Sequence, residues 1–310
     1  MAACKFRLPD APSRFLVGAA IVMHAYRQFV HSFVGLARLG SQLPLGGFEP
    51  LPRPNLAPDA PKALIFSPHP DDECIIGALG LRLLRDSQMR VVNVAVTLGS
   101  NKARQPERLA ELRHACAFLG FDLRETVPNG LEHINPKARQ DHPEDWAGKV
   151  SVIAGILRAE RPRLIFFPHD HDWNSTHEGV HWLVADALAT LDPAFECYTV
   201  ETEFWGQCDD PNLAVESSEA DVADLIAGLS FHVGEVRRNP YHVLLPAWMM
   251  DNVRRGAELV GGQGGGAPGF TFATLYRLRR WRGGKFERFY AGGRMLPAVA
   301  STATLFRESA

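Results

Sequence analysis

The sequence has little cysteine and no long apolar run. Its 310 residues include five cysteines, an odd number, and no Cys-x-x-Cys pair. This argues against a secreted disulfide framework and against a cysteine zinc site, and it favours a reducing, cytoplasmic location. Histidine, arginine and glutamine interrupt the most apolar segment, Phe15–Ala37, so we expect no stable membrane span.

A surplus of basic charge is also absent. The formal net charge is −2, so no strong basic field points to nucleic acid. No Gly-x-Gly-x-x-Gly follows the first predicted strand, and the residues there are acidic where a phosphate-binding loop is neutral or basic. We therefore expect a small-molecule ligand and no nucleic acid, and a homo-oligomer stays open.

Proline and apolar periodicity divide the chain into two parts. Residues 1–61 contain a predicted N-terminal helix followed by a strap, residues 44–61, whose six prolines exclude regular structure. The amphipathic pattern of the helix favours packing on the main domain or on another subunit. Residues 62–310 are expected to form a single domain.

Strands and helices alternate from residue 62 onward, which predicts an α/β fold with a mostly parallel sheet. The expected strands are 63–67, 91–98, 164–168 and 197–201, and the expected helices are 72–86, 106–120, 150–159, 175–190 and 219–228. Residues 261–269 are rich in glycine and predict a mobile loop. Residues 270–290 predict a C-terminal β-hairpin with a Gly283-Gly284 turn.

The first group of chemically active residues follows the first predicted strand. The segment Pro68–Glu73 reads Pro-His-Pro-Asp-Asp-Glu and supplies one imidazole and three carboxylates. Capping of the next helix would explain one aspartate but not the whole cluster. The carboxyl edge of a parallel sheet is where ligands bind, so the cluster indicates a metal or catalytic site.

The second group is rich in histidine and follows the strand at 164–168. Ser175 and Glu178 form a capping-box pattern that predicts a helix beginning near Thr176, with His177 in its first turn. His177 would point back toward the sheet. His181 lies one turn later, so chelation of one metal by His177 and His181 is an alternative. His169 and His171 are expected in the loop near the site, with His171 exposed.

The two groups together predict one catalytic centre. His69, Asp72 and His177 make two histidines and one carboxylate, a donor set typical of catalytic zinc with an open position for water. Asp71 is adjacent to a ligand without being needed as one, which makes it the candidate general base.

Several motifs resemble the PIG-L/LmbE family of zinc-dependent N-deacetylases. The segment 64–77 (LIFSPHPDDECIIG) contains the family's Pro-His-Pro-Asp-Asp-Glu signature. Arg108-x-x-Glu111 and the following Leu119-Gly120 are similar to its second conserved helix. Residues 174–177 align with its His-x-x-His segment. The resemblance is best over residues 62–192 and implies a Rossmann-like three-layer sandwich.

The resemblance also implies roles for individual residues. It implies one zinc ion per chain on His69, Asp72 and His177, with water activated by Asp71. Asn174 replaces the family histidine that stabilises the oxyanion, and an amide N–H could still donate there. The candidate substrate-binding residues are Arg108, Asn129 and His232. Arg108 could instead form only an ion pair with Glu111 on its own helix.

The expected function is hydrolysis of a linear amide. We expect the protein to remove acetyl from an N-acetylamino sugar or a conjugate of one. Two alternatives remain open at this point: a related amidase that acts on a sugar–thiol or N-acyl conjugate, and a sugar-binding protein whose catalysis has decayed.

Overall fold

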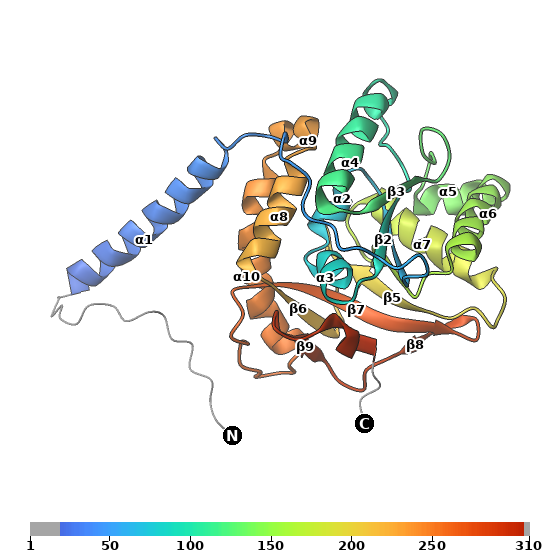
Figure 1. Ribbon diagram of the computed structural model, residues 1–310. Helices are drawn as coiled ribbons and strands as arrows, with labels where there is room; N and C mark the ends of the chain where they lie inside the picture. Colours follow the sequence, from blue (N-terminus) through green and yellow to red (C-terminus); the bar gives the residue numbers. More distant parts are fainter. Residues whose placement is uncertain (1–18, 307–310) are drawn as a thin grey trace.

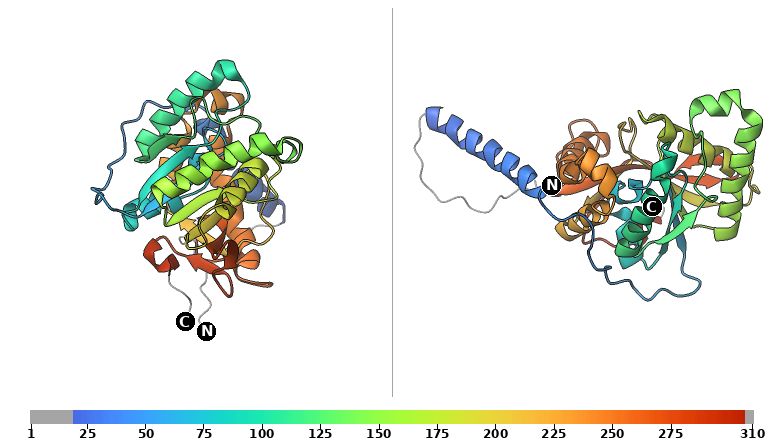
Figure 2. Two further views of the ribbon diagram at one scale, coloured as in Figure 1. Left: turned by 90° about the vertical axis from the view of Figure 1, so that its right-hand side faces the viewer. Right: turned by 90° about the horizontal axis from the view of Figure 1, so that it is seen from above.

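The computed structural model describes residues 19–306 and has a nine-stranded sheet with helices on both faces (Figures 1 and 2). The strands are β1 (Lys62–Ser67), β2 (Arg90–Ala95), β3 (Asp122–Glu125), β4 (Leu164–Pro168), β5 (Cys197–Thr202), β6 (Leu213–Ser217), β7 (Phe272–Arg282), β8 (Lys285–Arg288) and β9 (Arg294–Leu296). The helices are α1 (Ala19–Gly40), α2 (Asp72–Ile75), α3 (Leu79–Asp86), η1 (Lys102–Arg104), α4 (Gln105–Leu119), α5 (Pro136–Asp141), α6 (Pro143–Glu160), α7 (Ser175–Ala189), α8 (Glu219–Leu229), α9 (Val233–Arg238), α10 (Tyr241–Leu259) and η2 (Thr302–Phe306).

The strand order in the sheet is β3-β2-β1-β4-β5-β7-β6-β9, and it combines parallel and antiparallel neighbours. The first five strands are mutually parallel, whereas β7 runs antiparallel to both β5 and β6. The predicted α/β class with a mostly parallel sheet is confirmed. The predicted hairpin is also present as β7 and β8, although β7 is a long interior strand of the main sheet.

Alternation along β1 explains the layers. Ala63 and Ile65 face a core shared with α3, α4 and α8, whereas Leu64 and Phe66 face a core shared with α6 and α7. Both faces of the strand are buried, as expected for a parallel strand with helices on each side. The result is the three-layer arrangement that the resemblance implies.

The order of connection reverses between β1 and β4. From β1 the chain moves outward to β2 and β3, and it then returns to β4 and β5 on the other side. Such a switch point opens a crevice at the carboxyl ends of the two strands, where ligands bind in open α/β sheets. The predicted site loops follow β1 and β4, so the topology brings them together.

The helix predicted over 72–86 is wrong in one respect, because it breaks at Gly77. The glycine has a φ of 86°, and a Cβ atom there would lie 2.1 Å from Thr274 Oγ1. The Tyr276 hydroxyl also donates to the carbonyl oxygen of Ile76 at 2.5 Å. Close approach of β7 therefore divides the segment into α2 and α3.

In residues 19–61 the helix α1 is followed by the proline-rich strap. The strap has neither helix nor strand and is tied to α4 by the Leu51 amide, which donates to the Phe118 carbonyl at 2.9 Å. Most of α1 does not pack on the main domain, because the helix projects away from the body in Figure 1 and in the right-hand view of Figure 2. Packing on another subunit stays a prediction. Residues 15–18 of the predicted helix lie outside the described residues. No helix within residues 19–306 has the length and apolarity that crossing a bilayer requires.

Candidate active site

The loop after β1 is held rigidly by its neighbours. The Thr97 hydroxyl, just beyond β2, donates to the Pro68 carbonyl at 2.7 Å, and Ser67 donates to Asn93 Oδ1 at 2.6 Å inside the core. Two prolines restrict the loop further. The side chains that follow are therefore positioned before any ligand binds.

Three predicted ligands converge at the switch point. His69 Nδ1 lies 3.2 Å from His177 Nε2, and Asp72 Oδ2 lies 3.6 Å from the first nitrogen and 3.5 Å from the second. Asp72 and His177 are buried, and His69 is half-buried. Sequence reasoning predicted all three, and the structure brings them together as a candidate metal site.

The donor set fits a divalent metal. Burial lowers the pKa of His177 although Asp72 opposes the shift, which favours the neutral imidazole that binds metals. Its Nδ1 is buried without a hydrogen-bond partner and lies 3.7 Å from Asp172 Oδ1. A ligand histidine commonly directs its second nitrogen to a carboxylate in this way.

Asp172 is itself well held. Its Oδ1 accepts from the amide of Asn174 at 2.9 Å, and its Oδ2 accepts from the amides of Trp205 and Gly206 at 3.1 and 3.2 Å. The carboxylate therefore links the loop after β4 to the loop after β5 and places a fixed acceptor behind His177.

Asp71 has an unusual backbone. Its φ of 117° is in a region that residues other than glycine rarely adopt. The conformation is held by the Asp71 amide, which donates to Glu73 Oε2 at 3.0 Å, and by its carbonyl, which accepts from the Cys74 amide at 3.0 Å. Strain of this kind often accompanies functional residues.

The carboxylate of Asp71 contacts two residues from distant segments. The Tyr241 hydroxyl donates to its Oδ2 at 2.6 Å, and Arg108 Nη2 lies 3.8 Å from the same oxygen. Burial and the neighbouring Asp72 raise the pKa of Asp71 to about 7, while His232, Arg108 and Tyr241 oppose the rise. A carboxylate with a pKa near neutrality is suited to general-base catalysis.

Arg108 reaches the site and does not simply pair with Glu111. Its Nη2 also donates to the Pro70 carbonyl at 2.9 Å, and its Nε lies 3.8 Å from Glu235. The structure thus places this candidate substrate-binding residue against the loop after β1, beside the Asp71 carboxylate.

Glu73 and His232 form a second buried pair behind the site. His232 Nε2 lies 2.7 Å from Glu73 Oε1, and both side chains are fully buried. Burial alone would lower the pKa of His232, but the Glu73 carboxylate raises it. The structure gives His232 no exposed surface, so it supports the loop through Glu73, and direct contact with substrate has no support.

The other histidines of the segment after β4 bond elsewhere and do not join the candidate metal ligands. His181 Nδ1 lies 2.9 Å from the Pro168 carbonyl and 3.7 Å from Glu201, so the geometry does not favour chelation by His177 and His181. His171 is exposed, as predicted. His169 is buried, and its Nε2 lies 2.9 Å from the Gly206 carbonyl.

Asn174, and not the predicted capping box, begins the helix after β4. Its Oδ1 accepts from the Thr176 amide at 2.9 Å, and the helix starts at Ser175. The amide oxygen is therefore occupied by the cap, and only the NH₂ group is available as a donor. A role for Asn174 in stabilising an oxyanion stays a prediction.

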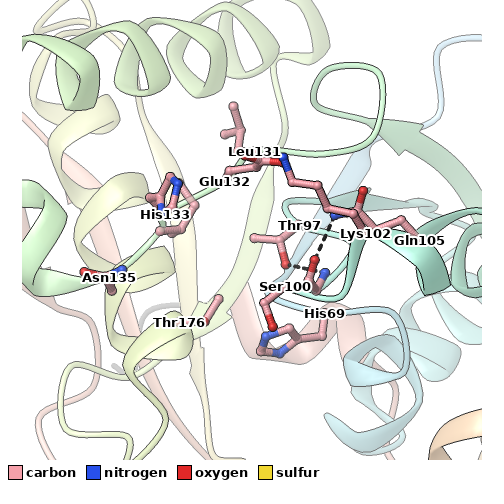
Figure 3. A pocket seen from close by; sticks show the side chains of 12 residues that line it. His69, Thr97, Ser100, Lys102, Gln105, Leu131, Glu132, His133, Asn135 and Thr176 are labelled. Atoms are coloured by element: carbon pink, nitrogen blue, oxygen red, sulfur yellow. Dashed lines mark hydrogen bonds and ion pairs between the residues drawn. The ribbon is translucent and has the colours of Figure 1, made fainter.

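A cavity of about 300 Å³ opens beside His69 (Figure 3). Its remaining lining comes from two loops and the start of α7: Thr97, Gly99, Ser100, Lys102, Gln105, Leu131, Glu132, His133, Ile134, Asn135 and Thr176. Lys102 pairs with Glu132 at 2.9 Å across this space. Asn129, the predicted substrate contact, lies in the preceding turn and is not part of the lining.

Two residues of the candidate site, Tyr241 and Asp172, were not predicted from the sequence. Tyr241 begins α10, and no local motif marks it. Asp172 belongs to the histidine-rich segment, and its position five residues before His177 was the only available signal. Both act through tertiary contacts that one sequence does not reveal.

The fold and the site define an α/β protein with a candidate metal centre at its switch point. Residues 64–188 match the family PIG-L, described as GlcNAc-PI de-N-acetylase. The PIG-L resemblance predicted from the motifs is confirmed over this segment.

Solved structures share the fold at low sequence identity. A conserved protein from Thermus thermophilus is 19% identical with a TM-score of 0.53, and the match covers 69% of this chain and 93% of that one. The N,N′-diacetylchitobiose deacetylase from Pyrococcus horikoshii is 18% identical with a TM-score of 0.49, covering 82% and 93%. Teicoplanin deacetylase Orf2 is 14% identical with a TM-score of 0.48, covering 71% and 98%. No curated protein matches the chain.

Proposed function

We propose that the protein is a zinc-dependent hydrolase that removes the acetyl group from an N-acetylamino sugar or a conjugate of one. The observation that carries the proposal is the convergence of His69, Asp72 and His177 beside the buried carboxylate of Asp71. The PIG-L match and the deacetylases among the similar structures support the same reaction class.

Zinc is the metal that suits this site best. Two imidazole nitrogens and one carboxylate oxygen are a common ligand set of catalytic zinc, and they leave a position open. Bound zinc lowers the pKa of water and polarises a carbonyl group. The chain's own contribution is to hold His177 with Asp172 and to keep Asp72 beside both histidines.

Asp71 supplies the proton transfers. It takes a proton from the attacking water and later returns one to the nitrogen of the leaving amine. Tyr241 and Arg108 hold its carboxylate in place during both transfers. The Asn174 NH₂ group is the candidate donor to the negative charge that develops on the amide oxygen.

The cavity provides the substrate site. Its volume lies at the small end of the range for small-molecule pockets, roughly 300–1,000 Å³. Hydroxyl, amide and charged groups dominate its lining, and they can bind the hydroxyls of one sugar ring. We therefore place the sugar between the Leu131–Asn135 segment and the Ser100–Gln105 segment, with its acetamido group toward His69.

Acetate release tests the proposal. The full chain is incubated with N-acetylglucosamine, N,N′-diacetylchitobiose and a simple acetamide, before and after chelation and after addition of zinc or magnesium. We expect acetate from an acetylated sugar, loss of turnover on chelation and recovery with zinc. Sugar binding without acetate release by the zinc-loaded protein would identify a binding protein instead.

A further inference from the structure

The helix α1 presents a large apolar surface that the described residues do not cover. Tyr26, Phe29 and Leu36 are each 66% exposed, and Phe33 is 48% exposed. These positions follow the i, i+3, i+7 and i+10 spacing of one helical face. Single exposed apolar residues are ordinary, but a continuous face of large side chains marks an interaction surface.

The opposite face of α1 carries basic side chains and no acidic ones. His24, Arg27, His31 and Arg38 fall together on it and are exposed. No aspartate or glutamate occurs anywhere between Asp10 and Glu49. An apolar face backed by arginine and histidine, with no acid at all, is typical of helices that lie in the plane of a bilayer surface.

A second copy of the chain is a poorer occupant of this face. Helices that pair along an apolar seam use opposite charges at its borders to set their alignment. The helix has no acid with which a partner helix could pair its arginines. An anionic lipid surface supplies the complementary charge along the whole helix.

The apolar surface is connected to the candidate active site. Gly40, at the end of α1, approaches α10 so closely that a Cβ atom there would lie 2.6 Å from Val243. The next residue, Leu244, is 55% exposed. One turn earlier on α10 is Tyr241, whose hydroxyl bonds Asp71 and whose ring contacts the half-exposed Trp205 at 6.4 Å between centroids.

We propose that α1 binds the surface of an anionic membrane, with its apolar face among the lipid chains and its arginines at the phosphates. Leu244 and Trp205 continue this surface toward the site. The protein would then act at the membrane surface without spanning it. The proposal rests on α1 and its contacts, independently of the reaction the site catalyses.

Vesicle binding by the full chain tests it. The parent protein is sedimented with vesicles of phosphatidylcholine alone and with vesicles in which a quarter of the lipid is phosphatidylglycerol. We expect binding to the anionic vesicles that weakens as salt rises, since salt screens the arginines. Arg27→Glu with Arg38→Glu should weaken it by roughly tenfold or more.

Matched controls separate the helix from general charge and hydrophobicity. Lys137→Glu with Lys285→Glu makes the same charge change at exposed sites elsewhere and should bind like the parent. Phe29→Ser with Phe33→Ser should abolish binding, whereas Val299→Ser, at a residue 98% exposed, should not. Thermal unfolding confirms that each variant folds.

Three results would overturn the proposal. The first is no vesicle binding by the parent. The second is equal binding to neutral and anionic vesicles. The third is a concentration-dependent dimer that Phe29→Ser with Phe33→Ser dissociates, which would make the occupant a second copy.

Discussion

The two loops that build the candidate site use their polar side chains differently. In the loop after β1, His69, Asp71 and Asp72 all face the site, and Glu73 holds their backbone from behind. In the longer segment after β4, only His177, in the first turn of α7, joins the candidate metal ligands. Most polar side chains of the first loop therefore lie at the candidate site, whereas most of those in the second segment make structural contacts.

That support has identifiable parts. Asp172 and Asn174 tie the loop to its neighbours and start α7, while Asp170 pairs with Arg277 at 2.5 Å. Histidine is abundant in this segment, yet His169 and His181 each place a ring nitrogen within hydrogen-bond distance of a backbone carbonyl. The contrast shows that residue type alone does not identify a ligand; the fold must also aim it.

The largest effect should come from removing the single ligand of the second loop. His177→Ala should lose the bound metal and all turnover, because two ligands remain. His181→Ala is the matched control in the same helix and should keep one metal per chain. Elemental analysis of both variants measures the metal content. Metal loss in His181→Ala but not in His177→Ala would identify His181 as the ligand instead.

The next largest effect should come from the candidate general base in the first loop, Asp71. Asp71→Asn should lower kcat by roughly 10²–10⁴-fold, the usual contribution of general-base catalysis, while metal content stays unchanged. Acetate release and elemental analysis provide the two measurements. Turnover near the parental rate would exclude Asp71 as the base.

Asp172→Asn should test the supporting role of the second segment. It removes the carboxylate beside His177 Nδ1 and should lower the metal affinity. Loss of a carboxylate acceptor for a ligand histidine commonly costs roughly 10–100-fold in metal affinity. Competition with a chromogenic chelator measures it. Asp170→Asn, two residues earlier, should leave the affinity unchanged, and equal weakening in both variants would argue for a general loop effect.

A smaller effect should follow from Tyr241→Phe. The hydroxyl lowers the pKa of Asp71, so its loss should raise that pKa and move the acidic limb of the kcat profile to higher pH. We expect roughly a tenfold loss of kcat below neutrality and little at high pH. Tyr198→Phe, on β5, is the control, and an unmoved limb would mean that the hydrogen bond is only structural.

The sequence predicted the ligands because their signals are local. His69, Asp71 and Asp72 lie within four residues, and alternating strands and helices were enough to bring His177 to the same edge. The apolar strands β1, β2, β4 and β5 were also predicted, since burial on both faces leaves a clear pattern. The short, half-buried β3 has no such pattern and was missed.

What the sequence could not predict depends on contacts between distant segments. Tyr241 bonds a residue 170 positions away, and His232 bonds one 159 positions away. The break at Gly77 depends on β7, almost two hundred residues later. Likewise, the pattern of α1 showed an amphipathic helix but not that its apolar face would be left exposed. The cytoplasmic location, the domain division and the oligomeric state stay predictions.

The strained backbone of Asp71 implies that this position lowers the stability of the fold while supporting activity. A φ of 117° costs little for glycine but strains other residues. Asp71→Gly should therefore raise the free energy of unfolding by roughly 1 kcal/mol while abolishing turnover, which chemical denaturation and acetate release would measure. Selection for thermal stability alone would thus favour glycine at position 71, and only selection for activity would keep the aspartate.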